Sequence, residues 1–212
     1  HELAKVVGNE IAVAQHSPAL GYHAGLMLVG STRYTVEGNH FTSLGSGWGS
    51  AGTIIINSGH EANSLYRNVI DGFHVGTLAV GMNDGPAAFD GLALKCNEYL
   101  NGTYDIYVWG GDIGLLQGIC GSASGPAGNT FLPASTLPGD FDIRALKQSA
   151  QEIIYSHHTG APYTPVSSNP NIVVRVPCNI PFVPADSCPP VADQSTHAGL
   201  DADIAAHHQQ AM

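Results

Sequence analysis

Turn signals recur about every ten residues along much of the chain, and short apolar runs lie between them. Residues 103–109 (TYDIYVW), for example, lie between Asn101-Gly102 and Gly110-Gly111 and are rich in aromatic and β-branched side chains. Both faces of this run carry bulky side chains, which indicates a strand that is covered on both sides or lies at an interface. Strands separated by such closely spaced turns predict a mainly β fold, an antiparallel sandwich- or barrel-like module rather than a βαβ protein.

The first residues show the same pattern around a single tight turn. Gly8-Asn9 lies between residues 3–7 and residues 11–14, two apolar runs with β-branched members. A Gly-Asn pair with such flanks is typical of a β-hairpin. An amphipathic helix over residues 1–16 is the alternative, but we favour the hairpin and expect the two runs to pair with each other.

Toward the C-terminus the pattern changes. Residues 142–156 predict a helix, because Asp142 can cap its N-terminus and apolar residues follow at helical spacing. These apolar residues are Leu146, Ala150, Ile153 and Ile154. The sequence thus predicts a β-rich globular domain over residues 1–164 with one C-terminal helix. A Pro-rich strap with a short strand at 172–176 and a polar tail is expected over residues 165–212.

Charge and hydropathy limit the partners that we expect. Charged side chains make up 11% of the 212 residues, with seven Lys and Arg against seventeen Asp and Glu. Phosphate contacts need clustered cations, so we expect no nucleic-acid partner. The sequence has no apolar run of about eighteen residues, so we expect no membrane span. Because the chain starts at His1 without an initiator Met, we interpret it as the mature form of a secreted protein.

Four cysteines support this extracellular interpretation. An even number without a CxxC spacing indicates disulfides in an oxidising compartment. Three pairings are formally possible, and we favour Cys96 with Cys120 and Cys178 with Cys188 because this pairing closes two short loops. Each bond would stabilise the fold by about 2–4 kcal/mol. The sequon Asn101-Gly102-Thr103 falls on a predicted turn and makes Asn101 a candidate glycosylation site.

Eleven histidines suggest a metal site, and one of them is the first residue. An N-terminal histidine offers an amine and an imidazole to one ion. With His1, its acidity, its size and its four cysteines, the chain resembles the lytic polysaccharide monooxygenases. That resemblance implies copper bound at His1 and oxidation of a polysaccharide. No recognisable motif surrounds a second histidine or a C-terminal axial tyrosine, and no HExxH is present.

Two further resemblances imply different roles. Residues 22–30 (YHAGLMLVG) and 107–111 (YVWGG) resemble the histidine strand and the segment before the nucleophile of NlpC/P60-type papain-like peptidases. With His23 ahead of Cys120, the order is that of the permuted members, and the resemblance implies that these two residues are catalytic. Residues 89–120, with a Tyr-x-Ile-Tyr-Val strand between two cysteines, resemble secreted fungal cell-wall proteins of the hyphal and phialide type. That resemblance implies a non-catalytic protein of an extracellular surface.

Aromatic side chains offer a last candidate site. Trp48, Tyr66, Tyr104, Tyr107 and Trp109 could form a platform on which sugar rings stack, although aromatic residues in strands more often belong to the core. We therefore expect a secreted, disulfide-stapled structural or binding protein without catalytic residues or a cofactor. Copper chemistry at His1 and cysteine hydrolysis by Cys120 and His23 are the enzymatic alternatives. The expected partners are a cell-surface polysaccharide or further copies of the chain, because its low charge and extended Pro-rich end favour self-association.

Overall fold

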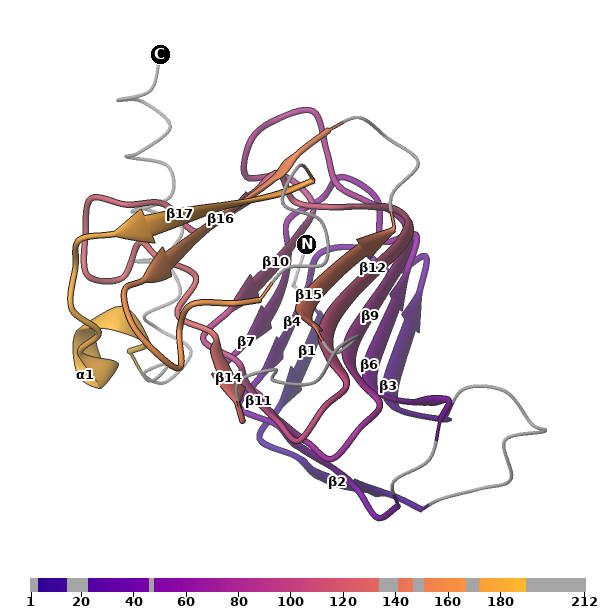
Figure 1. Ribbon diagram of the computed structural model, residues 1–212. Coiled ribbons are helices and arrows are strands. Elements are labelled where there is room, and N and C mark those ends of the chain that lie inside the picture. Colours follow the sequence, from indigo (N-terminus) through magenta and orange to yellow (C-terminus); the bar gives the residue numbers. More distant parts are fainter. Residues whose placement is uncertain are drawn as a thin grey trace.

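The fold is known from a computed structural model that describes residues 4–14, 23–45, 48–133, 141–146, 151–166 and 172–189. Within these ranges the chain winds into a parallel β-helix, a coil in which each turn adds one strand to each of three sheets (Figure 1). The expectation of a mainly β fold is confirmed. The expectation of antiparallel sheets is wrong, because the strands pair in parallel throughout the sheets.

Each of the three sheets stacks one strand per turn. The first sheet contains β1 (Ala4–Val7), β4 (Tyr34–Glu37), β7 (Asn63–Tyr66) and β10 (Leu92–Lys95). The second contains β2 (Glu10–Val13), β5 (His40–Ser43), β8 (Val69–Asp71), β11 (Glu98–Leu100) and β14 (Thr130–Leu132). The third contains β3 (His23–Val29), β6 (Ser50–Ile56), β9 (Val75–Asn83), β12 (Tyr104–Ile113) and β15 (Phe141–Leu146).

The closely spaced turns are corners of the coil and not hairpins. At each corner the chain passes from one sheet to the next, so a strand meets its partner only after a complete turn. Parallel strands need a long crossover, and here the two other strands of the turn provide it. The N-terminal hairpin prediction fails in the same way: β1 and β2 flank Gly8-Asn9 as expected, but β1 pairs with β4 and β2 pairs with β5.

One corner is built by a column of asparagines. Asn9, Asn39, Asn68, Asn97 and Asn129 take the same place in five successive turns. Along the column, the backbone N–H and Nδ2 of each asparagine donate to Oδ1 of the next, from Asn39 to Asn68 at 3.1 and 3.0 Å. The residue before each asparagine has a φ between 54° and 68°. This left-handed conformation bends the chain sharply at the corner and lets the next strand begin.

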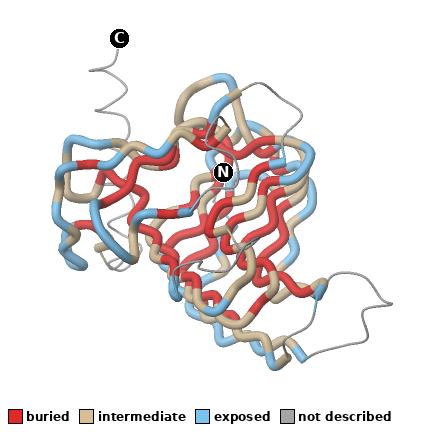
Figure 2. The backbone as a smooth tube through the Cα atoms, viewed as in Figure 1, coloured by how far each residue is buried: buried red, intermediate tan, exposed pale blue. Residues whose placement is uncertain are grey.

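Inside the coil, side chains of successive turns stack in columns. Phe41, Ile70, Tyr99 and Phe131 form one column along the second sheet, and the rings of Tyr99 and Phe131 stack at 5.8 Å. Gly76 of the third sheet leaves room for this column, because a Cβ there would lie 2.6 Å from Cδ1 of Tyr99. Buried residues accordingly run along the inside of the coil (Figure 2).

The last turn is closed by a fourth sheet of β13 (Leu116–Gln117), β16 (Ile153–His158) and β17 (Val173–Cys178), at the upper left of Figure 1. Tyr155 of β16 is buried at the C-terminal end of the core, and Nδ2 of Asn129 donates a hydrogen bond to its hydroxyl at 2.9 Å. Its ring centroid is 6.3 Å from that of Phe131, and burial raises the pKa of the Tyr155 hydroxyl. The asparagine column therefore ends on a buried tyrosine.

The helix predicted over residues 142–156 is wrong. Its two described parts belong to β15 and β16, and the inward residues follow a period of two, as Ile143 and Ala145 do. Asp142 is no helix cap; its buried carboxylate accepts a hydrogen bond from the backbone N–H of Val166 at 2.6 Å. One short helix, α1 (Pro184–Ser187), does lie near the C-terminus, and no helix in the described ranges could cross a membrane.

Two disulfides fasten the C-terminal segment to the coil. Cys96 bonds Cys188, and Cys120 bonds Cys178, across sequence separations of 92 and 58 residues. The presence of two disulfides is confirmed, but the expected local pairing is wrong, because the C-terminal segment folds back onto the last turns. In the chain-entropy model a loop of about ninety residues contributes about 4–5 kcal/mol, more than the short loops would. Part of the expected strap, residues 167–171 and 190–212, lies outside the described residues.

The asparagine column generates the first testable prediction. Asn68→Ala removes the acceptor of two bonds from Asn39 and two donors of its own, leaving buried polar groups unpaired. We expect a loss of about 3 kcal/mol in the free energy of unfolding, measured by chemical denaturation. Asn9→Ala at the exposed end of the same column is the matched control and should cost about 1 kcal/mol or less. Equal losses in the two variants would contradict a cooperative column.

The disulfide connectivity generates the second testable prediction. Mass spectrometry of a digest prepared without reductant should contain peptides linking Cys96 to Cys188 and Cys120 to Cys178. The same digest after reduction is the control and should contain the four cysteine peptides separately. A peptide pair linking Cys96 to Cys120 would contradict the structure.

Candidate functional site

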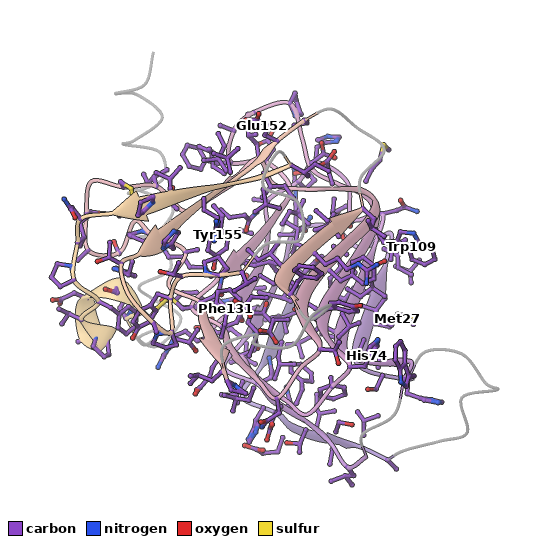
Figure 3. All side chains as sticks on the ribbon, viewed as in Figure 1. Met27, His74, Trp109, Phe131, Glu152 and Tyr155 are labelled. Carbon is purple, nitrogen blue, oxygen red and sulfur yellow. A yellow bond between two sulfur atoms is a disulfide. The ribbon has the colours of Figure 1, made fainter. Side chains whose placement is uncertain are left out.

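The outward side chains of the third sheet form the candidate site, which we call the outer face. Two rows of aligned residues define it along the five strands. They are Met27, Ile54, Leu78, Tyr107 and Arg144 in one row, and Val29, Ile56, Val80, Trp109 and Leu146 in the other. These residues alternate along each strand with core residues, so their side chains point away from the coil. Figure 3 shows Met27, His74 and Trp109 on this side of the molecule.

The outer face is apolar and partly open to solvent. The side chains of Met27, Val29 and Trp109 are 50%, 60% and 51% exposed. Between them, Ile54 and Leu78 are buried and form a second apolar cluster with flanking residues of the same sheet. Exposed apolar patches of this kind in a folded protein mark contact surfaces more often than chance. The outer face therefore has the character of a binding surface.

A row of rings crosses one end of this face. Trp48 packs against His74 with ring centroids 4.6 Å apart and ring planes tilted by 38°, and His74 and Tyr104 meet edge to face at 5.4 Å. Tyr104 lies 5.5 Å from Tyr107. Trp48, His74 and Tyr104 come from three successive turns, so their spacing follows the separation of neighbouring strands, about 4.8 Å. Trp48 is the outermost ring and is 78% exposed.

Arg144 is a cation that contacts two rings of this row, those of Tyr104 and Tyr107. Its guanidinium carbon lies 4.6 Å from the ring centroid of Tyr104 and 5.2 Å from that of Tyr107. Its Nη1 also donates a hydrogen bond to the Tyr104 hydroxyl. A guanidinium over two rings has further N–H donors for a ligand, while its aromatic neighbours supply apolar contact. The outer face therefore offers stacking surfaces and hydrogen-bond donors side by side.

Of the five aromatic residues proposed from the sequence, the structure brings four to this side. Tyr66 is the exception: it lies on β7 of the first sheet, and its hydroxyl donates to the carbonyl of Pro189 at 2.8 Å. Burial raises the pKa of the Tyr66 hydroxyl to about 12. His74 and Arg144 were missed. Asn39, Asn68 and Asn97 are 29 residues apart, as are Leu78 and Tyr107. Leu78 follows Ile54 by only 24 residues, and Arg144 follows Tyr107 by 37, so the asparagine spacing does not place His74 or Arg144.

The proposed thiol site is not formed. Cys120 is bonded to Cys178 and has no thiol that could act as a nucleophile. His23 begins β3, and three strand spacings, about 14 Å, separate it from β12, which precedes Cys120. A nucleophile and its base must lie within hydrogen-bond reach. The structure therefore does not bring Cys120 and His23 together.

The remaining candidates have separate outcomes. His1 lies outside the described residues, so copper binding there stays a prediction. In the part of the chain that the structure describes, no three His, Cys, Asp or Glu side chains group as metal ligands. Asn101 lies on the turn after β11, exposed, with Nδ2 donating to Oδ1 of Asp71 at 2.8 Å. Its glycosylation stays a prediction.

Comparison with known proteins adds no identity. No family model matches the chain, and neither a curated protein nor a solved structure matches it. A role must therefore be inferred from the geometry of the described residues. Among them, the outer face combines exposed rings, apolar side chains and one cation.

The placement of the two tryptophans generates a prediction. They are the only tryptophans of the chain and both belong to this side, so tryptophan fluorescence reports on it selectively. Acrylamide should efficiently quench the tryptophan fluorescence of the folded protein. The Trp109→Phe variant, which retains Trp48, should give a larger quenching constant than Trp48→Phe, because Trp48 is more exposed. Both variants should become equal in denaturant, and blue-shifted, unquenched emission of the native protein would contradict the exposed placement.

Proposed function

We propose that the protein is a secreted, non-enzymatic binding protein of an extracellular surface, and that its outer face binds polysaccharide. The observation that carries this proposal is the row of rings formed by Trp48, His74 and Tyr104 on three successive turns. Tyr107 lies next to Tyr104 on the same strand, and Trp109 is exposed further along that strand. Two disulfides support an extracellular site of action, because such bonds persist in oxidising compartments.

The chemistry of the face favours sugars over other ligands. A pyranose ring presents C–H groups on its faces and hydroxyls around its rim, so it stacks on an aromatic ring while its rim forms hydrogen bonds. Trp48 and Trp109 provide exposed indoles on which a sugar ring can stack. Arg144 and the Tyr104 hydroxyl provide hydrogen-bond partners for the sugar hydroxyls. Trp and Arg are also the residue types that contribute most to binding at protein surfaces.

The parallel stacking of turns explains why a long ligand is favoured. Because each turn repeats the same corner, equivalent positions on β3, β6, β9, β12 and β15 form straight rows across the sheet. A rigid face of five parallel strands offers the same kind of contact at regular intervals, which suits a polymer with regular repeats. Little conformational entropy is lost on binding, since the strands are already ordered.

Binding to insoluble polysaccharides tests the proposal. Sedimentation with cellulose, chitin, β-1,3-glucan and peptidoglycan should retain the protein on at least one, and tryptophan fluorescence should change with a soluble fragment of that polymer. Trp109→Ala and Trp48→Ala should each weaken binding about tenfold or more. Val183→Ala, which removes an exposed apolar side chain beside α1, is the control and should bind as the unmodified protein does.

Two outcomes would overturn this function. One is the absence of binding to any of the four polymers under conditions in which the protein is folded. The other is binding that both tryptophan variants retain in full, because the sugar would then lie elsewhere on the molecule.

A further inference from the structure

The two ends of the coil differ. At the first turn, β1, β2 and β3 each pair on one side only and form the outer strands of their sheets. Their inward side chains Val6, Ile11 and Leu28 are only partly buried. The residues aligned with them one turn further on, Val36, Phe41 and Ile55, are completely buried. Among the described residues, nothing therefore covers the core at this end, where Figure 2 shows β2 along its lower edge without red.

Backbone and side-chain hydrogen bonds are also left open there. The Oδ1 atoms of the later asparagines accept bonds from the preceding turn, whereas no described residue donates to Oδ1 of Asn9. In β2, the carbonyls of Asn9 and Val13 accept bonds from the following turn. Since backbone groups alternate in direction along a strand, the N–H and C=O of Ala12 point to the open side.

In the part of the chain that the structure describes, the opposite end has no such edge. The carbonyl of Leu92 accepts bonds from the N–H of Gly114 and the side chain of Gln117, and Cys96 donates to the carbonyl of Ala127. Residues 151–166 and 172–189, which we call the capping segment, cover this end. The carbonyls of Pro162 and Val166 in this segment accept hydrogen bonds from the outer edges of β14 and β15. A second copy of the chain could therefore not add its first turn to this end.

We propose that two copies of the chain associate through their first turns, with the open edges of β1, β2 and β3 pairing about a two-fold axis. Because the far end is capped, a second copy can offer only the same edge, so the contact is isologous and closes as a dimer. A two-fold axis reverses the strand direction, and the strands pair in antiparallel fashion across the interface. The proposal concerns assembly and is independent of ligand binding by the outer face.

The corner at Gly8-Asn9 suits such an axis. β1 and β2 flank it with four residues each, so β1 of one copy can lie along β2 of the second. With the axis between Gly8 and Asn9, Val6 meets Ile11 of the second copy on the core side. On the solvent side, Lys5 lies diagonally opposite Glu10 of the second copy, within reach of long side chains. One carboxylate oxygen of Glu10 lies 3.1 Å from Nδ1 of His40 in the same chain, but the Glu10 side chain is 81% exposed, and Lys5 is exposed with opposite charge.

Sedimentation velocity over a wide concentration range tests the proposal. The unmodified chain should show a reversible monomer–dimer equilibrium. Ala12→Pro removes an N–H that points to the open edge and leaves the bonds to β5 in place, so it should raise the dimer Kd about tenfold. Circular dichroism and the denaturation midpoint establish that the variant is folded.

Charge reversal gives a second test that does not alter the backbone. Lys5→Glu and Glu10→Lys should each raise the dimer Kd, and the double variant should restore it, because the opposite charges then meet again across the axis. Glu152→Lys carries the same change in net charge as Glu10→Lys, lies near the capped end and should leave the Kd unchanged.

Three outcomes would overturn the proposal. The first is a monomer at all concentrations. The second is a dimer whose Kd is the same in Ala12→Pro and in the two single charge variants. The third is a dimer weakened by Trp109→Ala instead, which would place the contact on the outer face.

Discussion

The column of asparagine amides is the interaction on which the rest of the structure depends. Each inner amide bonds the turns on both sides of its own, as Asn68 does to the carbonyl of Val36 in the preceding turn and to Asn97 in the next. An amide in this place is buried and would be costly if unpaired, so the column tolerates neither a shifted corner nor a slipped strand. The asparagines stay aligned although the turns between them differ slightly in length, at 30, 29, 29 and 32 residues from Asn9 to Asn129.

Aligned corners convert a local bend into long-range order. Beside the corner, paired residues of the first two sheets are 29 residues apart in the middle turns, as Asn63 and Leu92 are. The third sheet keeps its strands paired although the spacing there varies, from 24 residues between Ile54 and Leu78 to 29 between Leu78 and Tyr107. Inside the coil this stacks Tyr99 on Phe131, and outside it aligns Tyr107 with Leu78 and Arg144. The core column and the outer face thus have the same origin. A ligand site made of rows of side chains is a consequence of the register rather than of any single loop.

A stack of repeated turns has ends that must be protected, since its outer strands carry unpaired backbone groups. This chain closes one end with Tyr155 and the capping segment, which Cys96–Cys188 and Cys120–Cys178 tie to the coil. The first turn has no comparable cover among the described residues. The two ends therefore differ: both disulfides lie at the capped end, and the edge strands β1, β2 and β3 lie at the other.

The sequence by itself determined that the chain is mainly β, that its four cysteines form two disulfides and that strands flank Gly8-Asn9. These follow from residue type and nearest neighbours: β-branched and aromatic runs, closely spaced turns and an even count of cysteines. Only the tertiary structure decided strand direction, disulfide partners and the grouping of Trp48, His74 and Arg144. A turn that bends into a corner and one that reverses into a hairpin use the same residues. The choice between them depends on hydrogen bonds made 29 residues away, where Asn68 meets Asn39.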